Sequence, residues 1–428
     1  MLSEHSAATV RATLPAVGGA IEDITARFYD RLFTAHPELL RNLFNRGNQA
    51  AGTQRQALAG SLAAFATHLV RHPDERPDAM LARIAHKHAS LGVTPGQYKV
   101  VHRHLSAAIA EVLGDAVTPE VAAAWDEVYW LMAGALIAIE RRLYAERGIL
   151  AGATEPREWE VVERIEETPD VATFRLRPAD GRPAPAFRAG QYVSVRVELA
   201  DGARQIRQYS LSGAPGGDVR QITVKRVRGT GAAPDGEVSA HLHAHVRAGD
   251  RLWVSPAYGD LVLDGPTDAP LLLASAGIGV TPMAALLAQL VTDGHRGPVT
   301  VVHGDRCPSA HALRADQLAH TAALADATAH FWYEDLEGGA APGAGGPAVR
   351  AGLVDLSALP VAPGTRAYLC GPLPFMKAVR SQLLAEGVAP ADIHYEVFGP
   401  DLWLASPSSS GPVGEATMPS MVTGSSAA

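Results

Sequence analysis

Cysteine is almost absent from this chain, since Cys307 and Cys370 are the only two cysteines among its 428 residues. They form no Cys-x-x-Cys pair and supply no disulfide framework. The first residues, MLSEHSAATVRATL, also lack the basic region and the following apolar run of a signal peptide. We therefore expect a cytoplasmic protein that works in a reducing environment.

The chain has no excess of positive charge either. It carries 45 acidic against 37 basic side chains, a formal net charge of −8, and so offers no general attraction for nucleic acid or anionic lipid. One uncharged stretch, residues 270–291, has the length of a membrane span, but Gly277, Gly279 and Pro282 interrupt it. We expect a strand, a glycine turn and a helix there, no integral membrane segment and no nucleic-acid partner.

The hydrophobic pattern changes twice along the chain and predicts a multidomain protein. Residues 1–147 repeat apolar side chains three and four positions apart, for example at Ile21, Ile24 and Phe28. This period is typical of amphipathic helices and predicts an all-α domain of globin size. The small and polar segment 145–158 is interpreted as a linker.

Two further patterns follow the helical part. Residues 155–263 contain short runs that alternate apolar and polar side chains, as around Val193 and Val195, and predict an antiparallel β-barrel. Residues 266–400 alternate strand-like and helix-like segments, which predicts an α/β domain with a parallel sheet. The tail 401–428 is rich in Ser, Gly, Pro and Ala and is predicted to be disordered.

One histidine stands out on the helix predicted over residues 79–91. At about 100° per residue, His88 falls in line with Leu81 and Ile84, whereas His86 points to the opposite side, which we expect to face solvent. A buried neutral imidazole is the usual iron ligand of a helical haem pocket. The alternative is a core histidine bonded to a carbonyl, and on this observation alone that arrangement is the commoner one.

A carboxylate on an apolar helix face supports the haem interpretation. Glu140 shares its face with Leu136 and Tyr144, so it needs a hydrogen-bond donor nearby. A metal-bound histidine needs its second ring N–H held by a carboxylate, carbonyl or water. Glu140 and Tyr98 could hold His88 in this way, while the alternative for Tyr98 is ordinary core packing.

A second tyrosine is a candidate for the other face of the haem. Tyr29 follows Phe28 on the second predicted helix, and Gln54 stands one turn before Leu58 on an apolar stripe. A buried tyrosine hydroxyl needs a partner, and bound dioxygen is an acceptor. Core packing is again the alternative.

Short motifs in the second half are typical of flavin and nicotinamide binding. RQYS (207–210) offers an arginine for phosphate, a ring to lie on a flavin and a hydroxyl for a ring nitrogen. GEVS (236–239) leads into a helix-like run, and AGIGVTP (276–282) follows a buried strand and opens a helix. CGPLPFM (370–376) follows another strand, and HYEVFGP (394–400) closes the fold with Phe398 placed to cover a flavin. Each motif alone is also compatible with simple turn chemistry.

The ordered set of motifs resembles the flavohemoglobin family over about residues 1–400. The helical half contributes FYDRLF (28–33), QRQAL (54–58), IAHKH (84–88) and GQYKVV (96–101). The other half contributes GQY (190–192) and the strings described above. The reductase half alone is shared with many ferredoxin-reductase-like enzymes, so the joint set carries the resemblance.

The resemblance implies a role for each matching position. His88 would be the proximal iron ligand, Tyr98 and Glu140 its charge relay, and Tyr29 the distal donor in a pocket lined by Gln54 and Leu58. Lys87 and Phe398 would influence redox behaviour near the flavin. The implied FAD contacts are Tyr192, Arg207, Gln208, Tyr209 and Ser210, with a second set at Val397, Phe398, Gly399 and Pro400. The implied nicotinamide nucleotide loop is Gly277, Ile278, Gly279, Val280, Thr281 and Pro282.

The implied activity is that of a nitric oxide dioxygenase with heme b, FAD and NAD(P)H. Electrons would pass from NAD(P)H through FAD to haem, and NO and O2 would become nitrate. A haem-based O2 or NO sensor and an NO or hydroperoxide reductase are the alternatives. We expect O2 and NO as small-molecule partners and a monomer, with a lipid as a further candidate occupant of the haem pocket. The choice between NADH and NADPH is left open.

Overall fold

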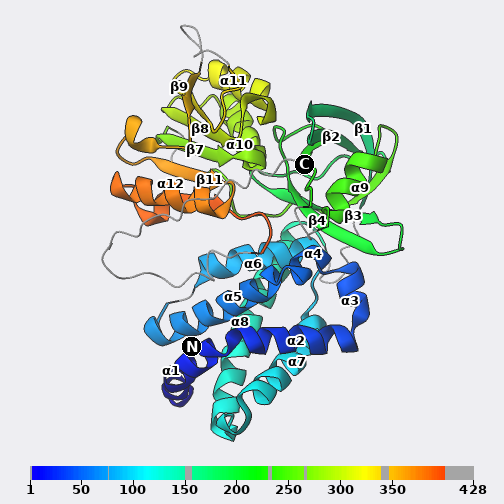
Figure 1. Ribbon diagram of the computed structural model, residues 1–428, viewed down its shortest axis with the longest axis vertical. Helices are drawn as coiled ribbons and strands as arrows, with labels where there is room; N and C mark the ends of the chain where they lie inside the picture. The colour runs from blue at the N-terminus through cyan, green and yellow to red at the C-terminus, as the bar shows by residue number, and fades with distance from the viewer. Residues whose placement is uncertain are drawn as a thin grey trace, which may run out of the picture.

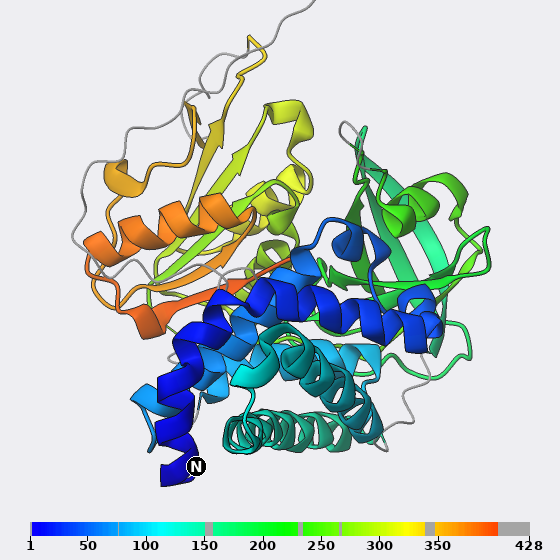
Figure 2. The ribbon, with the colours of Figure 1, turned by 60° about the horizontal axis from the view of Figure 1, so that its bottom comes forward.

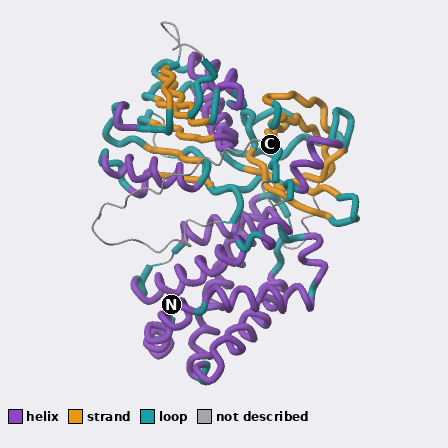
Figure 3. Tube along the Cα trace, in the orientation of Figure 1, coloured by secondary structure: helices purple, strands orange, loops and turns teal. Residues whose placement is uncertain are grey.

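The computed structural model describes residues 2–75, 77–149, 157–229, 234–264, 268–338 and 347–400. Half of the linker expected over 145–158, namely residues 150–156, and the whole tail expected over 401–428 lie outside these residues. The described chain forms a helical part, an antiparallel sheet and a parallel sheet (Figure 1, Figure 3). The predicted fold class is thus confirmed.

The first part is helical throughout, as its apolar period predicts. Its helices are α1 (Glu4–Gly19), α2 (Ile21–Ala35), α3 (Pro37–Asn42), α4 (Arg46–Ala50), α5 (Thr53–Arg71), α6 (Asp78–Leu91), α7 (Pro95–Leu113) and α8 (Pro119–Glu146). Local sequence marks several boundaries: Thr94 and Gln97 form a capping box at the start of α7, and the left-handed Gly92 ends α6.

The apolar faces of these helices form two separate hydrophobic clusters. One cluster gathers around α5, α6 and α8, and the other around α2 and α7. Leu62, Trp125 and Tyr129 pack against both. By length and hydropathy α8 would suit a membrane span, the only such helix among the described residues. Because its buried face joins the first cluster and bears Glu140, we interpret α8 as a core helix.

The second part is a six-stranded antiparallel sheet in the order β4-β3-β6-β1-β2-β5. Its strands are β1 (Arg157–Thr168), β2 (Val171–Pro178), β3 (Tyr192–Glu198), β4 (Arg204–Ser210), β5 (Arg220–Lys225) and β6 (Arg251–Val254), with α9 (Glu237–His245) beside them. A bridge between Leu211 and Ile222 joins the two edges of the sheet and closes the barrel. RQYS is the end of β4 itself, and GEVS already forms the start of α9.

A glycine before β3 brings two barrel segments into contact. Gly190 has φ +89°, and a Cβ there would lie 1.8 Å from the carbonyl oxygen of Leu261. Only glycine allows both the positive φ and this close approach. The GQY motif therefore has a backbone role beside any cofactor role of its tyrosine.

The third part is a parallel sheet in the order β10-β9-β8-β7-β11-β12. Its strands are β7 (Leu271–Ala276), β8 (Val299–Asp305), β9 (Ala327–Tyr333), β10 (Ala348–Ala351), β11 (Arg366–Cys370) and β12 (Ile393–Glu396). Its main helices are α10 (Val280–Asp293), α11 (Arg314–Ala323) and α12 (Leu373–Ala385). The uncharged stretch 270–291 is thus a strand, a glycine turn and a helix, as predicted.

The strand order reverses between β7 and β11. The chain runs outward from β7 to β8, β9 and β10, and then returns to β11 on the other side of β7. Ligands of open α/β sheets bind beyond the carboxyl ends of the strands at such a switch point. The AGIGVTP and CGPLPFM motifs both begin there.

The helical part docks on the barrel through α3, α4 and α6 (Figure 2). Gln205 on β4 donates its side-chain amide to the carbonyl oxygens of Leu40, Arg41 and Phe44, at 3.3, 2.9 and 3.3 Å. The α6 hydroxyl of Ser90 accepts a hydrogen bond from Ser194 of β3 at 3.0 Å. The Gln205 contacts hold α3 and the residues after it against β4, and the buried Ser90–Ser194 contact holds α6 against β3, the strand that bears the GQY tyrosine.

Candidate functional site

Three helices bring His88, Tyr98 and Glu140 together. The Nδ1 atom of His88 lies 3.0 Å from Oε1 of Glu140 and 2.9 Å from the hydroxyl of Tyr98. The Tyr98 hydroxyl also donates to the same carboxylate oxygen. Glu140 therefore has the nearby donors that its place on an apolar helix face requires.

The charge on this triad sits on Glu140. Its side chain is only 2% exposed, so ionised Glu140 depends on the hydrogen bonds that it accepts. Burial and the neighbouring carboxylate raise the pKa of Tyr98, which keeps that hydroxyl protonated and donating. With both donors directed at Glu140, we assign the proton of a neutral His88 imidazole to Nδ1.

The other ring nitrogen of His88 fits an iron ligand. Its side chain is 32% exposed within the helical part, and Nε2 makes no hydrogen bond to any residue that the structure describes. A neutral imidazole with one N–H held by a carboxylate presents its lone pair on the opposite nitrogen. This donor chemistry fits the proximal side of a haem.

Tyr29 lies in the second hydrophobic cluster with an amide group at its hydroxyl. It packs against Phe28, Phe33 and Phe44, and burial raises the pKa of its phenol. The side chains of Gln54 and Gln49 lie near the Tyr29 hydroxyl and partly offset this rise in its pKa. The predicted pair Tyr29 and Gln54 is therefore in contact, and Leu58 packs against the same cluster.

Gln49 was missed by the sequence reasoning. Its Nε2 is buried and has no hydrogen-bond partner among the described residues. Its only sequence signal is a position five residues before Gln54, in a short helix without an apolar stripe. A pocket for a small polar ligand would contain such an amide, buried beside a phenol and able to bond to the ligand.

The opposite side of α6 faces the barrel. His86 accepts a hydrogen bond from the backbone N–H of Gly259 at 3.0 Å, and the centre of its ring lies 6.5 Å from that of Tyr258. Burial there is the main cause of a lowered His86 pKa. The expectation that His86 faces solvent is wrong, because helical periodicity identifies a face but not the domain that covers it.

The closing segment of the chain also returns to α6. Lys87 donates to the carbonyl oxygen of Gly399 at 2.6 Å. Arg83 donates to the carbonyl of Tyr395 at 3.3 Å, and its guanidinium lies 4.0 Å from the centre of that ring. The two positions predicted to influence redox behaviour, Lys87 and Phe398, are thereby brought close in the fold, and Phe398 is 45% exposed.

Glu396 is a second functional candidate that the sequence reasoning missed. This carboxyl group at the end of β12 is buried, and its Oε2 has no hydrogen-bond partner among the described residues. Burial and the nearby Asp260 raise its pKa to about 8, against the lowering influence of Arg83 and Lys87. The signal in the sequence was an acid inside the strand-like run HYEVF.

The RQYS residues lie beside Tyr192, because β3 and β4 pair Tyr192 with Ser210. Gln208 donates to the hydroxyl of Ser194 at 3.1 Å, and Arg207 to the side-chain oxygen of Asn45 at 2.9 Å. The buried hydroxyl of Ser210 has no hydrogen-bond partner among the described residues. An unsatisfied hydroxyl at this position fits a flavin ring nitrogen or carbonyl.

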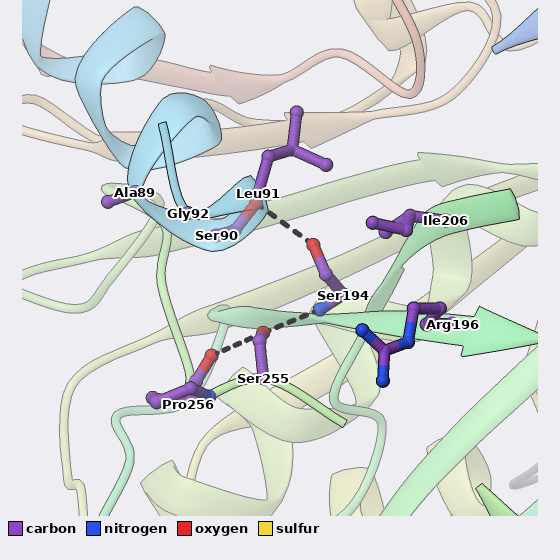
Figure 4. Close-up of a pocket in the computed structure, with 9 residues that line it drawn as sticks. All are labelled: Ala89, Ser90, Leu91, Gly92, Ser194, Arg196, Ile206, Ser255 and Pro256. Atoms are coloured by element: carbon purple, nitrogen blue, oxygen red, sulfur yellow. Dashed lines mark hydrogen bonds between the residues drawn. The ribbon is translucent and has the colours of Figure 1, made fainter. Parts of the chain in front are cut away.

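The pocket of Figure 4 lies between the last turn of α6 and strands β3 and β4. It is lined by Ala89, Ser90, Leu91, Gly92, Ser194, Arg196, Ile206, Ser255 and Pro256. Its volume of about 30 Å³ would hold a water molecule but no cofactor. The hydroxyls of Ser90, Ser194 and Ser255 already bond to one another or to backbone. We interpret it as a small gap in the domain interface.

The turn of the AGIGVTP motif and the start of the CGPLPFM motif lie in close contact at the switch point between β7 and β11. A Cβ on Gly279 would lie 2.2 Å from the carbonyl oxygen of Cys370. Gly277, Ile278 and Gly279 form a short 3-10 turn before α10, whereas Val280, Thr281 and Pro282 are buried. The backbone of the turn, rather than these buried side chains, is thus what this loop offers to a nucleotide phosphate.

Family models match each of the three parts of the chain, and known proteins match it over nearly its whole length. Residues 26–136 match the globin family model, 158–262 the oxidoreductase FAD-binding domain, and 273–381 the oxidoreductase NAD-binding domain. A flavohemoprotein of Chromobacterium violaceum is 41% identical over 402 residues, which cover 93% of this chain and 98% of the relative. One of Bacillus subtilis is 37% identical over 95% of this chain and 99% of its own length.

Two solved structures match this chain in fold. A flavohemoglobin from Malassezia yamatoensis with bound FAD and heme superposes with a TM-score of 0.82 at 36% identity, covering 93% of this chain and 100% of that chain. The FAD/NAD binding domain of a nitric oxide dioxygenase from Vibrio cholerae matches 57% of this chain and 100% of its own, with a TM-score of 0.52 at 35% identity.

The buried Glu396 makes stability depend on pH. Its pKa is about 8 in the folded chain and near the ordinary 4.5 when unfolded, so folding takes up a proton between these values. Stability from this group is therefore present at low pH and is lost as pH rises toward 8. We expect Glu396→Gln to gain on the wild type by at most about 1.4 kcal/mol per pH unit across this window, measured by denaturant unfolding of the purified protein. The exposed Glu386→Gln is the control, and a constant difference from pH 5 to 8 would contradict the assignment.

Proposed function

The chain belongs to the flavohemoprotein family, and we propose that it is a nitric oxide dioxygenase that converts NO and O2 to nitrate with electrons from NAD(P)H. One observation carries this proposal: an imidazole held by a buried carboxylate and a tyrosine lies in the same chain as complete FAD- and NAD-binding domains. The two free cysteines further support a reducing compartment, the cytosol.

Haem b, FAD and NAD(P)H are the cofactors of this activity. His88 would hold the haem through Nε2, Tyr192 and the RQYS residues would hold FAD with Val397 to Pro400, and the turn at Gly277 to Gly279 would receive the nucleotide. When bound, these groups would supply an acceptor for the hydride, a means of passing its two electrons on one at a time, and an iron for oxygen chemistry.

The role of Tyr98 and Glu140 is to orient and polarise His88. A carboxylate that accepts the Nδ1 proton gives the imidazole anionic character and makes Nε2 a stronger electron donor. Tyr98 keeps the carboxylate oxygen in place, since it donates to the same atom. This push favours oxygen activation over simple oxygen carriage.

On the distal side, Tyr29 would donate a hydrogen bond from its hydroxyl to the oxygen substrate. The side-chain amides of Gln49 and Gln54 lie near that hydroxyl and would set its direction. Leu58 and the rings around Tyr29 exclude water from the pocket, which strengthens a hydrogen bond to a partly negative oxygen. The small substrates O2 and NO need no larger recognition surface.

The α6 helix would couple the two halves. Its inner side bears His88, and its outer side contacts β3 through Ser90 and the closing segment through Lys87. The residues that would hold haem and FAD are therefore linked by one rigid helix. Such an arrangement keeps the donor and acceptor sites at a fixed separation.

The product of NO consumption tests the function. Purified protein supplied with NADH or NADPH, O2 and NO should show haem and flavin absorption bands and form nitrate in step with NO loss. Nitrous oxide as the main product would instead identify an NO reductase. NO binding without coenzyme consumption would identify a sensor.

Replacement of Tyr29 tests the distal site. We expect Tyr29→Phe to speed O2 dissociation and lower nitrate formation, each by roughly tenfold or more, because a hydrogen bond to a partly charged acceptor is worth about 1.5–3 kcal/mol. Stopped-flow O2 release and NO electrode traces measure these rates. Electron delivery to ferricyanide is the control and should stay at the wild-type rate. Unchanged O2 release would refute the distal role of Tyr29.

Replacement of Glu140 tests the proximal relay. Glu140→Gln retains the shape of the side chain and removes its charge, so we expect a lower iron–histidine stretching frequency in the resonance Raman spectrum of the reduced protein. The Glu120→Gln variant, at a side chain that is 57% exposed on the same helix, should leave that frequency unchanged. An E140Q variant with the wild-type frequency would show that the carboxylate does not polarise His88.

A further inference from the structure

A cluster of aromatic side chains leads from the helical core to the surface. Trp130 on α8 is 37% exposed, and the centre of its ring lies 5.3 Å from that of Tyr129 and 5.0 Å from that of His102 on α7. The His102 ring lies 5.0 Å from Tyr129 and bonds to Asp126 at 2.5 Å. We call Tyr129, Trp130, His102 and Asp126 the surface aromatic cluster.

Tyr129 connects this cluster to the proposed haem site. Its side chain packs against both hydrophobic clusters of the helical part, one containing Tyr98 and the other Tyr29. Its hydroxyl donates to the backbone oxygen of Tyr98 at 2.6 Å. A path of packed rings, joined to Tyr98 by this hydrogen bond to its backbone, therefore runs from the immediate neighbour of His88 to an exposed indole.

The chemistry of this path suits one-electron transfer. Phenol and indole rings are the protein side chains that lose single electrons most readily, and electrons move quickly between rings in close contact. The carboxylate of Asp126 places negative charge beside His102, next to both rings, which stabilises a positive charge left on either of them. Packing alone does not require an exposed indole at the end of such a path.

We infer that Trp130 is a surface electron donor that reduces the haem site through Tyr129 after reaction with a peroxide. This inference rests on the proposed haem site at His88. Hydrogen peroxide takes two electrons and two protons and becomes two water molecules, which leaves the haem site two electrons short. Trp130 supplies one of these electrons and releases its indole proton to solvent, and the haem site stays one electron short until an external one-electron donor supplies the second. The resulting indole radical either takes an electron from an external donor or reacts with O2, which adds oxygen to the ring.

The test uses the purified ferric protein with its haem, without NAD(P)H, and treats it with hydrogen peroxide. Peptide mass spectrometry then measures added oxygen on each tryptophan. Trp253 of β6 is a matched internal control, because it is 39% exposed and lies in the barrel, away from this cluster. We expect oxidation of Trp130 to exceed that of Trp253 several-fold.

Two variants test the route. Tyr129→Phe retains the ring but removes the oxidisable phenol, so oxidation of Trp130 should fall several-fold. Tyr144→Phe is the matched control, since Tyr144 lies on the same helix and also donates to a backbone oxygen, that of Val93 at 3.1 Å. It should leave oxidation of Trp130 unchanged.

Three outcomes would overturn the inference: equal oxidation of Trp130 and Trp253, oxidation of Trp130 that persists in Tyr129→Phe, or no oxidation of Trp130 although the haem absorption band changes with peroxide. A protein that takes up no haem would refute the proposed function and this inference together. With haem present, nitrate formation from NO stays independent of the result.

Discussion

A single buried carboxylate, Glu140, sets the requirements that the helical part must meet. An ionised group this far from water is tolerated only with hydrogen-bond donors at close range. Two donors reach it, the Tyr98 hydroxyl and Nδ1 of His88, each from a different helix. Satisfying Glu140 therefore fixes the packing of α6, α7 and α8 and, with the same contacts, the orientation of the imidazole. A hydrogen-bonding requirement of the fold therefore also orients the imidazole that we propose as the iron ligand.

The position of His88 on α6 then determines how the other domains are arranged. Residues one or two positions away from an inward-facing side chain point away from the core, so His86, Lys87 and Ser90 reach the barrel and the closing segment. The barrel offers the Gly259 N–H and the Ser194 hydroxyl there, and the closing segment offers the Gly399 carbonyl. Because these contacts are polar and directional, they hold the barrel and the closing segment against α6 with more specificity than apolar packing would.

The sequence predicted the elements and faces well, because both follow from local periodicity. The inward side of α6, the need of Glu140 for a donor, and the strand–turn–helix over residues 270–291 are all of this kind. The errors concern side chains that are buried by a segment distant in the sequence. His86 faces a domain instead of water, and Gln49 and Glu396 matter only because tertiary contacts bury them. No pattern of neighbouring residues contains that information, since it depends on how three domains meet. The roles of the cofactor-binding residues stay predictions.

Two buried carboxylic acids, Glu140 and Glu396, solve the same physical problem in opposite ways. Glu140 receives two donors and can carry its charge, whereas Glu396 has an unsatisfied oxygen, a like charge nearby in Asp260 and a raised pKa of about 8. Near neutral pH the first is suited to pushing electron density toward a metal ligand, and the second to retaining a proton. They also lie on opposite sides of α6, one on the proposed haem side and one where the closing segment meets Lys87.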